Sequence, residues 1–327
     1  MVNVHFESRP SAEPPKVQLG KPRVAIILAY FEGQAYVGEQ LQSILNQTHP
    51  AAHIYVSDDK SEPCFSFDGV RVDSCQLPPT SITIRDRNIG TTNNFLNALA
   101  TIAEDFEYFA FSDQDDIWYE DKLERALAAL AKAPPEKPAL YCARTEIADA
   151  TCEHSQGYSP QFNKLPSFAN ALVQNIAGGN TMVFNRAARD LIIYAAMGTN
   201  VVSHDWWCYQ IVSGAGGYVV YDSKPCLKYR QHANNQVGAN TSWRARFLRI
   251  SGLRKGRFRT WNDINLRALQ EYAHVLTREN RMILSDFIEA RQSPLLMRLF
   301  LFKRSGIYRQ TLFGNLGLWL GAVWNKV

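Results

Sequence analysis

Two clusters of carboxylates are the side chains of this chain best suited to bind a metal ion. One lies at residues 56–59, with the sequence VSDD, and the other at residues 111–116, with the sequence FSDQDD. Carboxylates held close together repel one another unless a cation lies among them, and their hard oxygens suit Mg²⁺ or Mn²⁺. The clusters therefore predict a divalent-metal site that binds substrate phosphates, and helix capping by the same acids is the alternative.

The chain lacks the glycine-rich loops through which many proteins bind phosphates with backbone amides. Neither GxGxxG nor GxxxxGK[ST] occurs in its 327 residues. A bound diphosphate would then depend on a metal ion held by the acidic clusters.

A further carboxylate, Asp205, lies in the sequence SHDWW at residues 203–207. A positioned carboxylate can accept the proton of an acceptor hydroxyl and so act as a general base. Trp206 and Trp207 would raise the pKa of this acid by excluding water, or would stack on a sugar ring. The alternative is an acid that caps a helix beginning at Trp206.

Short apolar runs alternate with helical periodicities and predict an α/β fold. The expected strands are residues 23–30, 53–56, 82–84, 108–112 and 139–143, with later ones at 182–184, 218–221 and 226–229. Apolar positions at helical spacing separate the early strands, and such crossovers join parallel strands. Ligands of open parallel sheets bind beyond the carboxyl ends of the strands, which is where both acidic clusters lie.

The C-terminal part of the chain differs in charge from the rest. Residues 244–327 contain 16 Lys+Arg and 5 Asp+Glu, although the whole chain has a net charge of only +4. We expect residues 243–327 to form a helical, basic and aromatic region after a catalytic domain at 22–242. This region fits either a surface that docks on an anionic membrane or a helical cap packed on the catalytic domain.

The leader and the cysteines favour a cytoplasmic protein. Residues 1–21 are rich in Pro and Ser and lack the apolar segment of a secretory signal, so we expect a disordered leader. The six cysteines show no metal spacing and fit reduced thiols. Such a protein can still bind peripherally to the inner face of the plasma membrane.

Three ordered segments resemble the family 2 inverting glycosyltransferases. They are RVAIILAYFEGQAYVGEQLQSILNQ, IYVSDDKS and FAFSDQDDIW, and the later YRQHANNQVG is similar to the bacterial rhamnosyltransferase branch. The resemblance covers roughly residues 22–240. It implies a GT-A fold, in which helices flank a Rossmann-like, mostly parallel sheet. The nucleotide-binding half would be about 22–150 and the acceptor half about 150–242.

The resemblance also implies a reaction. It is the inverting transfer of a sugar, L-rhamnose from dTDP-rhamnose, to a hydroxyl of a surface polysaccharide or lipid-linked glycan. A UDP-hexose donor is the alternative within the same fold.

Carried over to this chain, the resemblance implies roles for individual residues. Asp58 or Asp59 would bind the base of the nucleotide, and the loop containing Asn88 would lie near it. Asp113 and Asp115 would bind the ribose and the metal, Mn²⁺ or Mg²⁺.

For the acceptor side, the resemblance matches Asp205 to the general base. His232 fits a metal or diphosphate ligand and equally fits a structural histidine. Gly179 and Asn180 would let a sugar approach the backbone closely, or would form an ordinary turn.

Two other classes of protein fit the sequence less well. A sugar nucleotidyltransferase needs a Gly- and Lys-rich loop after its first strand, whereas AYFEGQAY at residues 29–36 has no Lys or Arg. A nucleic-acid-binding module would explain the basic tail, but the acidic clusters would repel a phosphate backbone. We therefore expect no nucleic acid among the partners.

Overall fold

A computed structural model of the chain describes residues 2–5, 20–68, 70, 72, 76–232 and 257–327. Its centre is an eight-stranded sheet in the order β1-β4-β3-β2-β5-β10-β7-β11. The strands are β1 (Val2–His5), β2 (Val24–Tyr30), β3 (His53–Asp58), β4 (Thr80–Ile84), β5 (Tyr108–Ser112), β7 (Ala139–Ala143), β10 (Val183–Asn185) and β11 (Tyr218–Asp222). Strands β4, β3, β2 and β5 are parallel, and β10 runs antiparallel to both of its neighbours.

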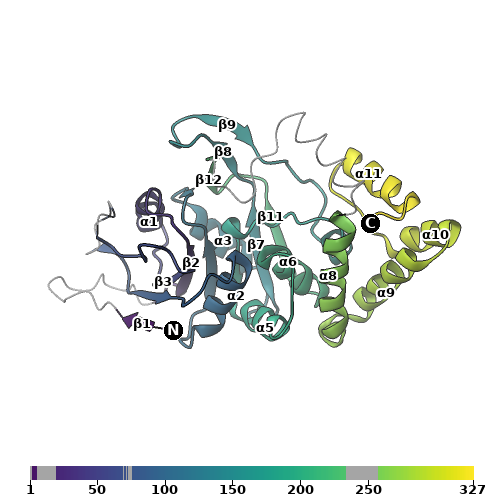
Figure 1. The fold of residues 1–327 in the computed structure, drawn as a ribbon, viewed down its shortest axis with the longest axis horizontal. Helices are drawn as coiled ribbons and strands as arrows, with labels where there is room; N and C mark the ends of the chain where they lie inside the picture. The colour runs from purple at the N-terminus through teal and green to yellow at the C-terminus, as the bar shows by residue number, and fades with distance from the viewer. Residues whose placement is uncertain (1, 6–19, 69, 71, 73–75, 233–256) are drawn as a thin grey trace.

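Helices cover both faces of this sheet (Figure 1). Successive side chains of a strand point to opposite faces, so β2 contributes to two hydrophobic cores. Its Ala25 and Ile27 join the core beneath α2, α5 and α6, whereas Val24 and Ile26 join the core beneath α1 and α3. The helices are α1 (Val37–Leu45), α2 (Thr91–Thr101), α3 (Lys122–Leu130), α5 (Arg186–Ala196) and α6 (His204–Gly214). This burial on both faces explains why the β2 sequence is apolar without alternation.

A second, four-stranded sheet in the order β6-β12-β8-β9 was not expected from the sequence. Its strands are β6 (Ile117–Trp118), β8 (Glu146–Ala148), β9 (Ser155–Tyr158) and β12 (Leu227–Arg230). Strand β6 directly follows the acidic residues after β5, and β12 pairs with it. The small sheet therefore brings the residues after β12 next to the acidic loop.

The C-terminal region is helical, as the sequence predicts. It consists of α8 (Arg257–Glu271), the 3₁₀ turn η3 (Ala273–Val275), α9 (Arg278–Gln292), α10 (Leu295–Ser305) and α11 (Leu312–Val323). Helices α8 and α9 pack on α6: the amide of Thr277 donates to Gly214 O at 3.0 Å, and Leu269 and Phe287 belong to the same core as α6. The interpretation as a cap is therefore confirmed for α8 and α9. The basic and aromatic segment at 243–256 lies outside the described residues.

The expectation of a disordered leader is wrong for Val2–His5. These residues form β1, which pairs antiparallel with β4 from Val2 opposite Ile84 to His5 opposite Ser81. The reason is that β4 would otherwise be an edge strand with unpaired backbone groups, which readily accept another strand. Residues 6–19 lie outside the described part of the chain.

Candidate active site

The acidic loop between β5 and β6 is fastened to the loop after β2. Gln114 makes two hydrogen bonds to the backbone of Phe31: its Nε2 donates to Phe31 O at 2.9 Å, and its Oε1 accepts from Phe31 N at 2.7 Å. A Cβ at Gly33 would lie 2.2 Å from the Gln114 side chain, so only glycine leaves room for this contact. The sequence analysis missed this role of Gln114 because the pairing joins residues far apart in the chain.

Asp115 and His232 lie together, as the metal prediction requires. The distance from His232 Nε2 to Asp115 Oδ2 is 2.8 Å, and the imidazole stacks on Tyr36 with ring centroids 4.7 Å apart. Arg230, two residues earlier, is buried and donates from Nε to Asp115 O at 2.8 Å. It also pairs with Glu39 on α1. Arg230 is thus a positioning residue of the acidic loop that the sequence analysis did not identify.

Asp116 is a buried acid. Its carboxylate accepts a hydrogen bond from Asn180, and the positive charge of Lys122 acts on it. Asn180 Nδ2 donates to Asp116 Oδ2 at 2.6 Å, and Lys122 Nζ donates to Asn180 O at 2.6 Å. Asp116 Oδ1 has no hydrogen-bond partner within the part of the chain that the structure describes. Burial and the nearby Asp115 raise the pKa of Asp116, and burial lowers the pKa of Lys122 to about 7.

Asp205 lies near the acidic loop, because the turn at Gly179 and Asn180 contacts both: a Cβ at Gly179 would lie 3.4 Å from Asp205 Cβ, and Asn180 donates to Asp116. Removal from water raises the pKa of Asp113 to about 7, and the negative charges of Asp115 and Asp205 add to this effect. Asp205 lies in the first turn of α6, where Asn175 Nδ2 donates to its Oδ2 at 2.9 Å and the Trp206 amide donates to its Oδ1 at 2.7 Å. A carboxylate from the second half of the domain and a carboxylate loop from the first half therefore share one site.

The prediction that Trp206 and Trp207 contact a sugar is wrong. Both rings are buried, and the indole N–H of Trp206 donates to Ala171 O at 2.7 Å. Because α6 packs against the sheet on one side and against α8 on the other, its first turn carries these rings into the core. Trp206 stacks on Phe258 of α8, with ring centroids 6.3 Å apart.

Asp58 and Asp59 each hold a loop at the end of β3. Asp58 accepts from the Ser61 amide at 2.8 Å and from the Phe65 amide at 2.6 Å. Asp59 accepts from the amides of Ile89 and Gly90, both at 2.8 Å. The two carboxylates are buried, so their visible role is to order the loops that would surround a nucleotide. Contact with the base stays a prediction.

The predicted residues Asn88, Gly179 and Asn180 also lie on loops near the site. Asn88 is exposed and accepts from the amide of Gly90 at 3.0 Å. Gly179 begins the 3₁₀ turn η2 (Gly179–Thr181), and a Cβ there would lie 2.4 Å from Nε2 of the buried His204. Glycine is therefore required for η2 to approach the first turn of α6, which supports the expected close approach but not yet a bound sugar.

The donor chemistry of the acidic loop fits a divalent cation. A carboxylate and an imidazole are accepted ligands of Mn²⁺, and a cation would offset both the burial and the carboxylate repulsion that raise the pKa of Asp113. Asp113, Asp115 and His232 were predicted as metal ligands, and of these Asp115 and His232 are in contact. Among the described residues, no three His, Cys, Asp or Glu side chains form a ready metal cluster. Waters and phosphates would have to supply the other ligands, as is usual for Mg²⁺.

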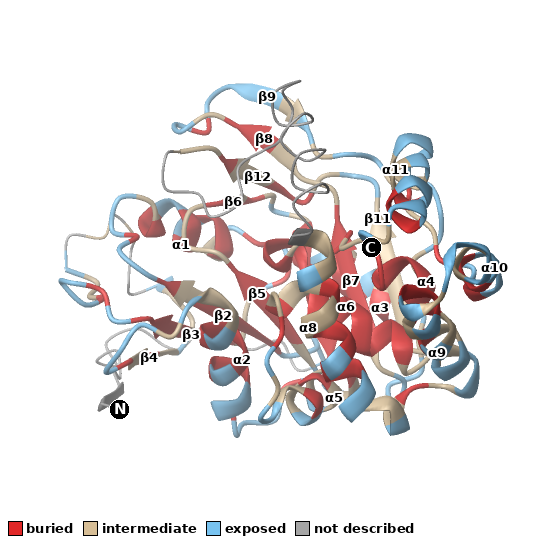
Figure 2. Cartoon of the chain, turned by 45° about the vertical axis from the view of Figure 1, so that its right-hand side comes forward, coloured by how far each residue is buried: buried red, intermediate tan, exposed pale blue. Residues whose placement is uncertain are grey.

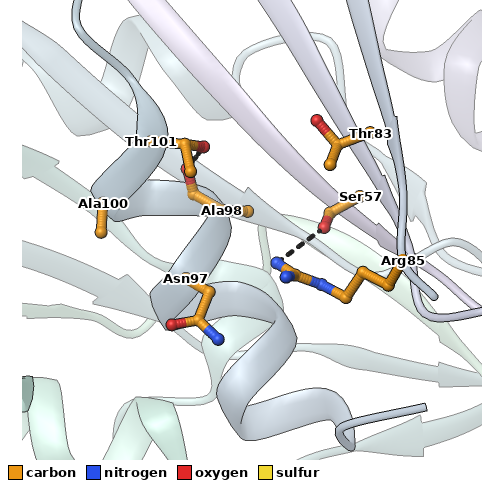
Figure 3. Close-up of a pocket in the computed structure, with 7 residues that line it drawn as sticks. All are labelled: Ser57, Thr83, Arg85, Asn97, Ala98, Ala100 and Thr101. Carbon is orange, nitrogen blue, oxygen red and sulfur yellow. Dashed lines mark hydrogen bonds between the residues drawn. The ribbon is translucent and has the colours of Figure 1, made fainter. Parts of the chain in front are cut away.

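A separate cavity of about 260 Å³ lies along the flank of α2 and not in the acidic loop. Figure 3 shows Arg85 reaching from the end of β4 toward Ser57, to which its Nη2 donates at 3.3 Å. The same guanidinium donates from Nε to Asn94 Oδ1 at 2.6 Å, and burial lowers the pKa of Arg85. This network joins β3 and β4 to α2 beneath the loop that Asp59 holds.

The chain belongs to glycosyl transferase family 2, because residues 24–192 match the model of that family. It is 29% identical over 252 residues to the dTDP-rhamnosyl transferase RfbG of Shigella flexneri, covering 71% of this chain and 81% of that protein. It is 24% identical over 232 residues to the putative teichuronic acid biosynthesis glycosyltransferase TuaG of Bacillus subtilis (strain 168), covering 69% and 84%. The protein is therefore a glycosyltransferase.

The fold agrees with this family. The crystal structure of S. aureus TarS matches with a TM-score of 0.51 at 12% identity, covering 92% of this chain and 55% of that one. At this identity the likeness concerns the fold alone. The mostly parallel sheet, flanked by helices and followed by a helical region, is the GT-A arrangement that the sequence predicts.

Proposed function

We propose that the protein transfers L-rhamnose from dTDP-rhamnose to a hydroxyl of a bacterial surface polysaccharide or lipid-linked glycan, with inversion at the anomeric carbon. The similarity to a dTDP-rhamnosyl transferase supports the donor. The observation that carries the mechanism is the position of Asp205, which comes from the second half of the domain and lies against Gly179, while the neighbouring Asn180 donates to Asp116 of the acidic loop. Inversion needs the leaving group and the base on opposite sides of the reacting carbon.

In this proposal Asp205 is the general base. The hydrogen bond from Asn175 orients its carboxylate, and the remaining lone pairs are available to take the proton of the acceptor hydroxyl. Asp113 binds the ribose, and Asp115 with His232 would hold Mn²⁺ or Mg²⁺. When bound, the cation supplies positive charge for the diphosphate of the donor. Gln114 and Arg230 keep the acidic loop in place for this task.

The loops held by Asp58 and Asp59, including Asn88, receive the nucleotide, and Gly179 with Asn180 borders the sugar. A panel of dTDP- and UDP-sugars, read as protection against thermal unfolding, tests the donor, because a ligand that binds the native state raises the melting temperature. Protection by a UDP-hexose and not by dTDP-rhamnose would replace the proposed donor with the alternative.

The base assignment predicts the effect of Asp205→Asn. The amide keeps the size of the side chain but removes its basic oxygen. Turnover should fall by roughly 10²–10⁴-fold while donor affinity is nearly unchanged. Asp190→Asn, at an exposed carboxylate on α5, is the matched control and should keep full turnover. Near-normal turnover of Asp205→Asn, or a product with retained anomeric configuration by NMR, would contradict the proposal.

The metal assignment predicts the effect of Asp115→Ala. Calorimetry of dTDP binding with and without Mn²⁺ should show that the metal strengthens binding to the wild type, and that the variant loses this enhancement. Glu120→Ala, at an exposed acid close to the same loop, should behave as the wild type. A variant at position 115 that keeps the full Mn²⁺ enhancement would remove Asp115 from the site.

A further inference from the structure

The outer surfaces of α10 and α11 carry a concentration of exposed apolar side chains. Of the 17 large apolar residues that are exposed in the described chain, 11 lie between residues 295 and 324. Leu312, Leu316 and Leu320 of α11 and Trp324, which caps its end, are all exposed at a spacing of four residues, which places them on one face. Leu312 is 86% exposed and Phe313 is 88% exposed. Soluble surfaces rarely leave so many neighbouring apolar groups in water.

The inner faces of the same helices are also apolar and are already packed. Leu301 and Phe302 of α10 are buried, and Phe302 contacts Phe287 of α9 with ring centroids 5.6 Å apart. Leu318 of α11 is buried, and Phe302 lies 6.2 Å from the Trp319 ring. Figure 2 shows the exposed residues on the outer sides of both helices, at the end of the molecule away from α1. The exposed apolar side chains of α10 and α11 are therefore not needed to pack these two helices against the rest of the protein.

The charged side chains that α10, α11 and their flanking residues contribute have one sign. Residues 290–327 contain six Lys+Arg and no Asp or Glu. Lys303, at the end of α10, and Lys326, after α11, are exposed. Arg304 is also exposed, although it pairs with Asp286 of α9. Two helices that contribute apolar side chains, Trp and cations but no acids match the boundary between anionic lipid headgroups and acyl chains.

We propose that the outer face of α10 and α11 inserts into one leaflet of an anionic lipid bilayer. The 12 residues of α11 span about 18 Å at 1.5 Å per residue, which is much shorter than the roughly 30 Å of a bilayer core. No helix in the described part of the chain is long and apolar enough to cross a membrane. Helices α10 and α11 therefore lie in the plane of the interface between water and lipid.

A second copy of the chain is a poorer occupant of this surface. In a two-fold dimer the same patch meets itself, so the cations beside the patch would face cations. Anionic lipid supplies the opposite charge, and Trp319 and Trp324 are of the residue type that favours membrane interfaces. The inference does not rest on the proposed sugar transfer, because vesicle binding needs neither donor nor acceptor.

Vesicle flotation of the full chain tests the proposal. Vesicles of phosphatidylglycerol and phosphatidylcholine should bind the protein, vesicles of phosphatidylcholine alone should bind it much less, and high salt should weaken binding because it screens the cations. Phosphatidylglycerol with brominated acyl chains should quench tryptophan fluorescence. The double variant Trp319→Phe/Trp324→Phe should lose most of this quenching but keep vesicle binding.

Surface variants separate the apolar and charged contributions. Phe313→Gln/Leu316→Gln should lower the partition coefficient at least tenfold, since these side chains would leave the acyl region. Lys303→Gln/Lys326→Gln should lower it about tenfold or more at low salt and little at high salt. Met197→Gln is the matched control, because Met197 is exposed and apolar but lies after α5; it should bind as the wild type.

Three outcomes would overturn the proposal. One is equal binding to neutral and anionic vesicles. Another is persistent quenching in Trp319→Phe/Trp324→Phe, which would assign the contact to another part of the chain. The third is a dimer, measured by light scattering, that Phe313→Gln/Leu316→Gln converts to a monomer while no form binds vesicles. That result would make the surface an interface between copies.

Discussion

Single residues set the distance between the two halves of the site. Gly179 in η2 lies against His204, and the next residue of each segment, Asn180 and Asp205, carries a polar group of the site. The His204 ring stacks on Phe95 with centroids 4.2 Å apart and is buried, so it has little room to move. A side chain at position 179 must therefore push η2 away from α6.

This contact predicts the effect of Gly179→Ala. A Cβ would lie 2.4 Å from His204 Nε2, so the first turn of α6 and Asp205 with it should shift. We expect turnover to fall at least tenfold, since a displacement of about 1 Å can cost up to 10²-fold. The melting temperature should also fall. Gly317→Ala, at a helical glycine of α11 with open space around its Cβ, is the control; it should keep full turnover and should not lower the melting temperature, because alanine is favoured over glycine inside a helix. Unchanged kinetics of Gly179→Ala would show that the contact does not position Asp205.

The secondary structure shows which elements a sequence can predict. The strands β2, β5 and β7 were predicted within one residue, because a strand buried on both faces is a continuous apolar run bounded by turn residues. Of the small sheet, only β12 was predicted as a strand, at 226–229; β6, β8 and β9 were missed because they have only two to four residues, and the sheet was missed because β12 pairs with β6 and β8 across long stretches of chain. The contact between Asp115 and His232 depends on that sheet; the position of His232 after the predicted strand at 226–229 suggested a metal or diphosphate ligand, but equally a structural histidine.

Burial explains the remaining difference between the predicted and the observed site, which is the role of the two tryptophans after Asp205. Two adjacent tryptophans beside an acid fit a sugar platform and a helix core equally well in the sequence. The packing of α8 on α6 places Trp206 in the core. The sequence does not reveal this packing locally, because Trp206 and its contact Phe258 are 52 positions apart in the chain. Similarly, nothing local indicates that Arg230 binds a backbone carbonyl of the acidic loop.

One ion-pair network joins α3 to the end of β11. Arg125 donates from Nε to Asp222 Oδ2 at 3.1 Å, and Tyr141 donates to the same oxygen at 2.8 Å. Partial burial acts to raise the pKa of Asp222, but the hydrogen bonds from Arg125, the Lys224 amide and Tyr141, together with the charge of Arg125, outweigh it and hold this pKa below its usual value. The ionised carboxylate therefore stabilises the folded protein. This stability is present above the unfolded pKa of about 4 and is lost as pH falls through the lower folded pKa.

Asp222→Asn tests this network. Urea unfolding at neutral pH should show a loss of about 1–3 kcal/mol, the usual contribution of hydrogen bonds to a charged group. Because the wild-type carboxyl becomes neutral in acid, the difference between wild type and variant should shrink as the pH falls below about 4. Asp190→Asn, in an exposed ion pair, should have little effect at either pH. A difference that stays constant with pH would show that the charge of Asp222 is not the source of its stability.

At the scale of the whole molecule, the C-terminal helices serve two purposes. The expected boundary at residue 242 does not divide the hydrophobic core, because Leu269 of α8 and Phe287 of α9 belong to the same cluster as Phe95 of α2. Asn280 also donates to the carbonyl of Gly214 at the end of α6, at 2.8 Å. Helices α8 and α9 thus complete the catalytic domain, and in the described part of the chain the outer face of α10 and α11 is the surface that we propose for the membrane.

Two leucine truncations in this region should separate these purposes. Leu269→Ala removes a fully buried side chain and should lower the free energy of unfolding by about 2–5 kcal/mol. Leu296→Ala removes one of similar size that is 83% exposed on α10, and should change the unfolding free energy by less than about 0.5 kcal/mol. The second variant should instead weaken flotation with anionic vesicles, whereas folded Leu269→Ala should float as the wild type, since its surface is unaltered. Urea unfolding without lipid and flotation at a temperature where both variants are folded measure the two effects. Destabilisation by Leu296→Ala would mean that the outer face of α10 supports the fold, and equal stability of Leu269→Ala and the wild type would mean that the cap is not part of the common core.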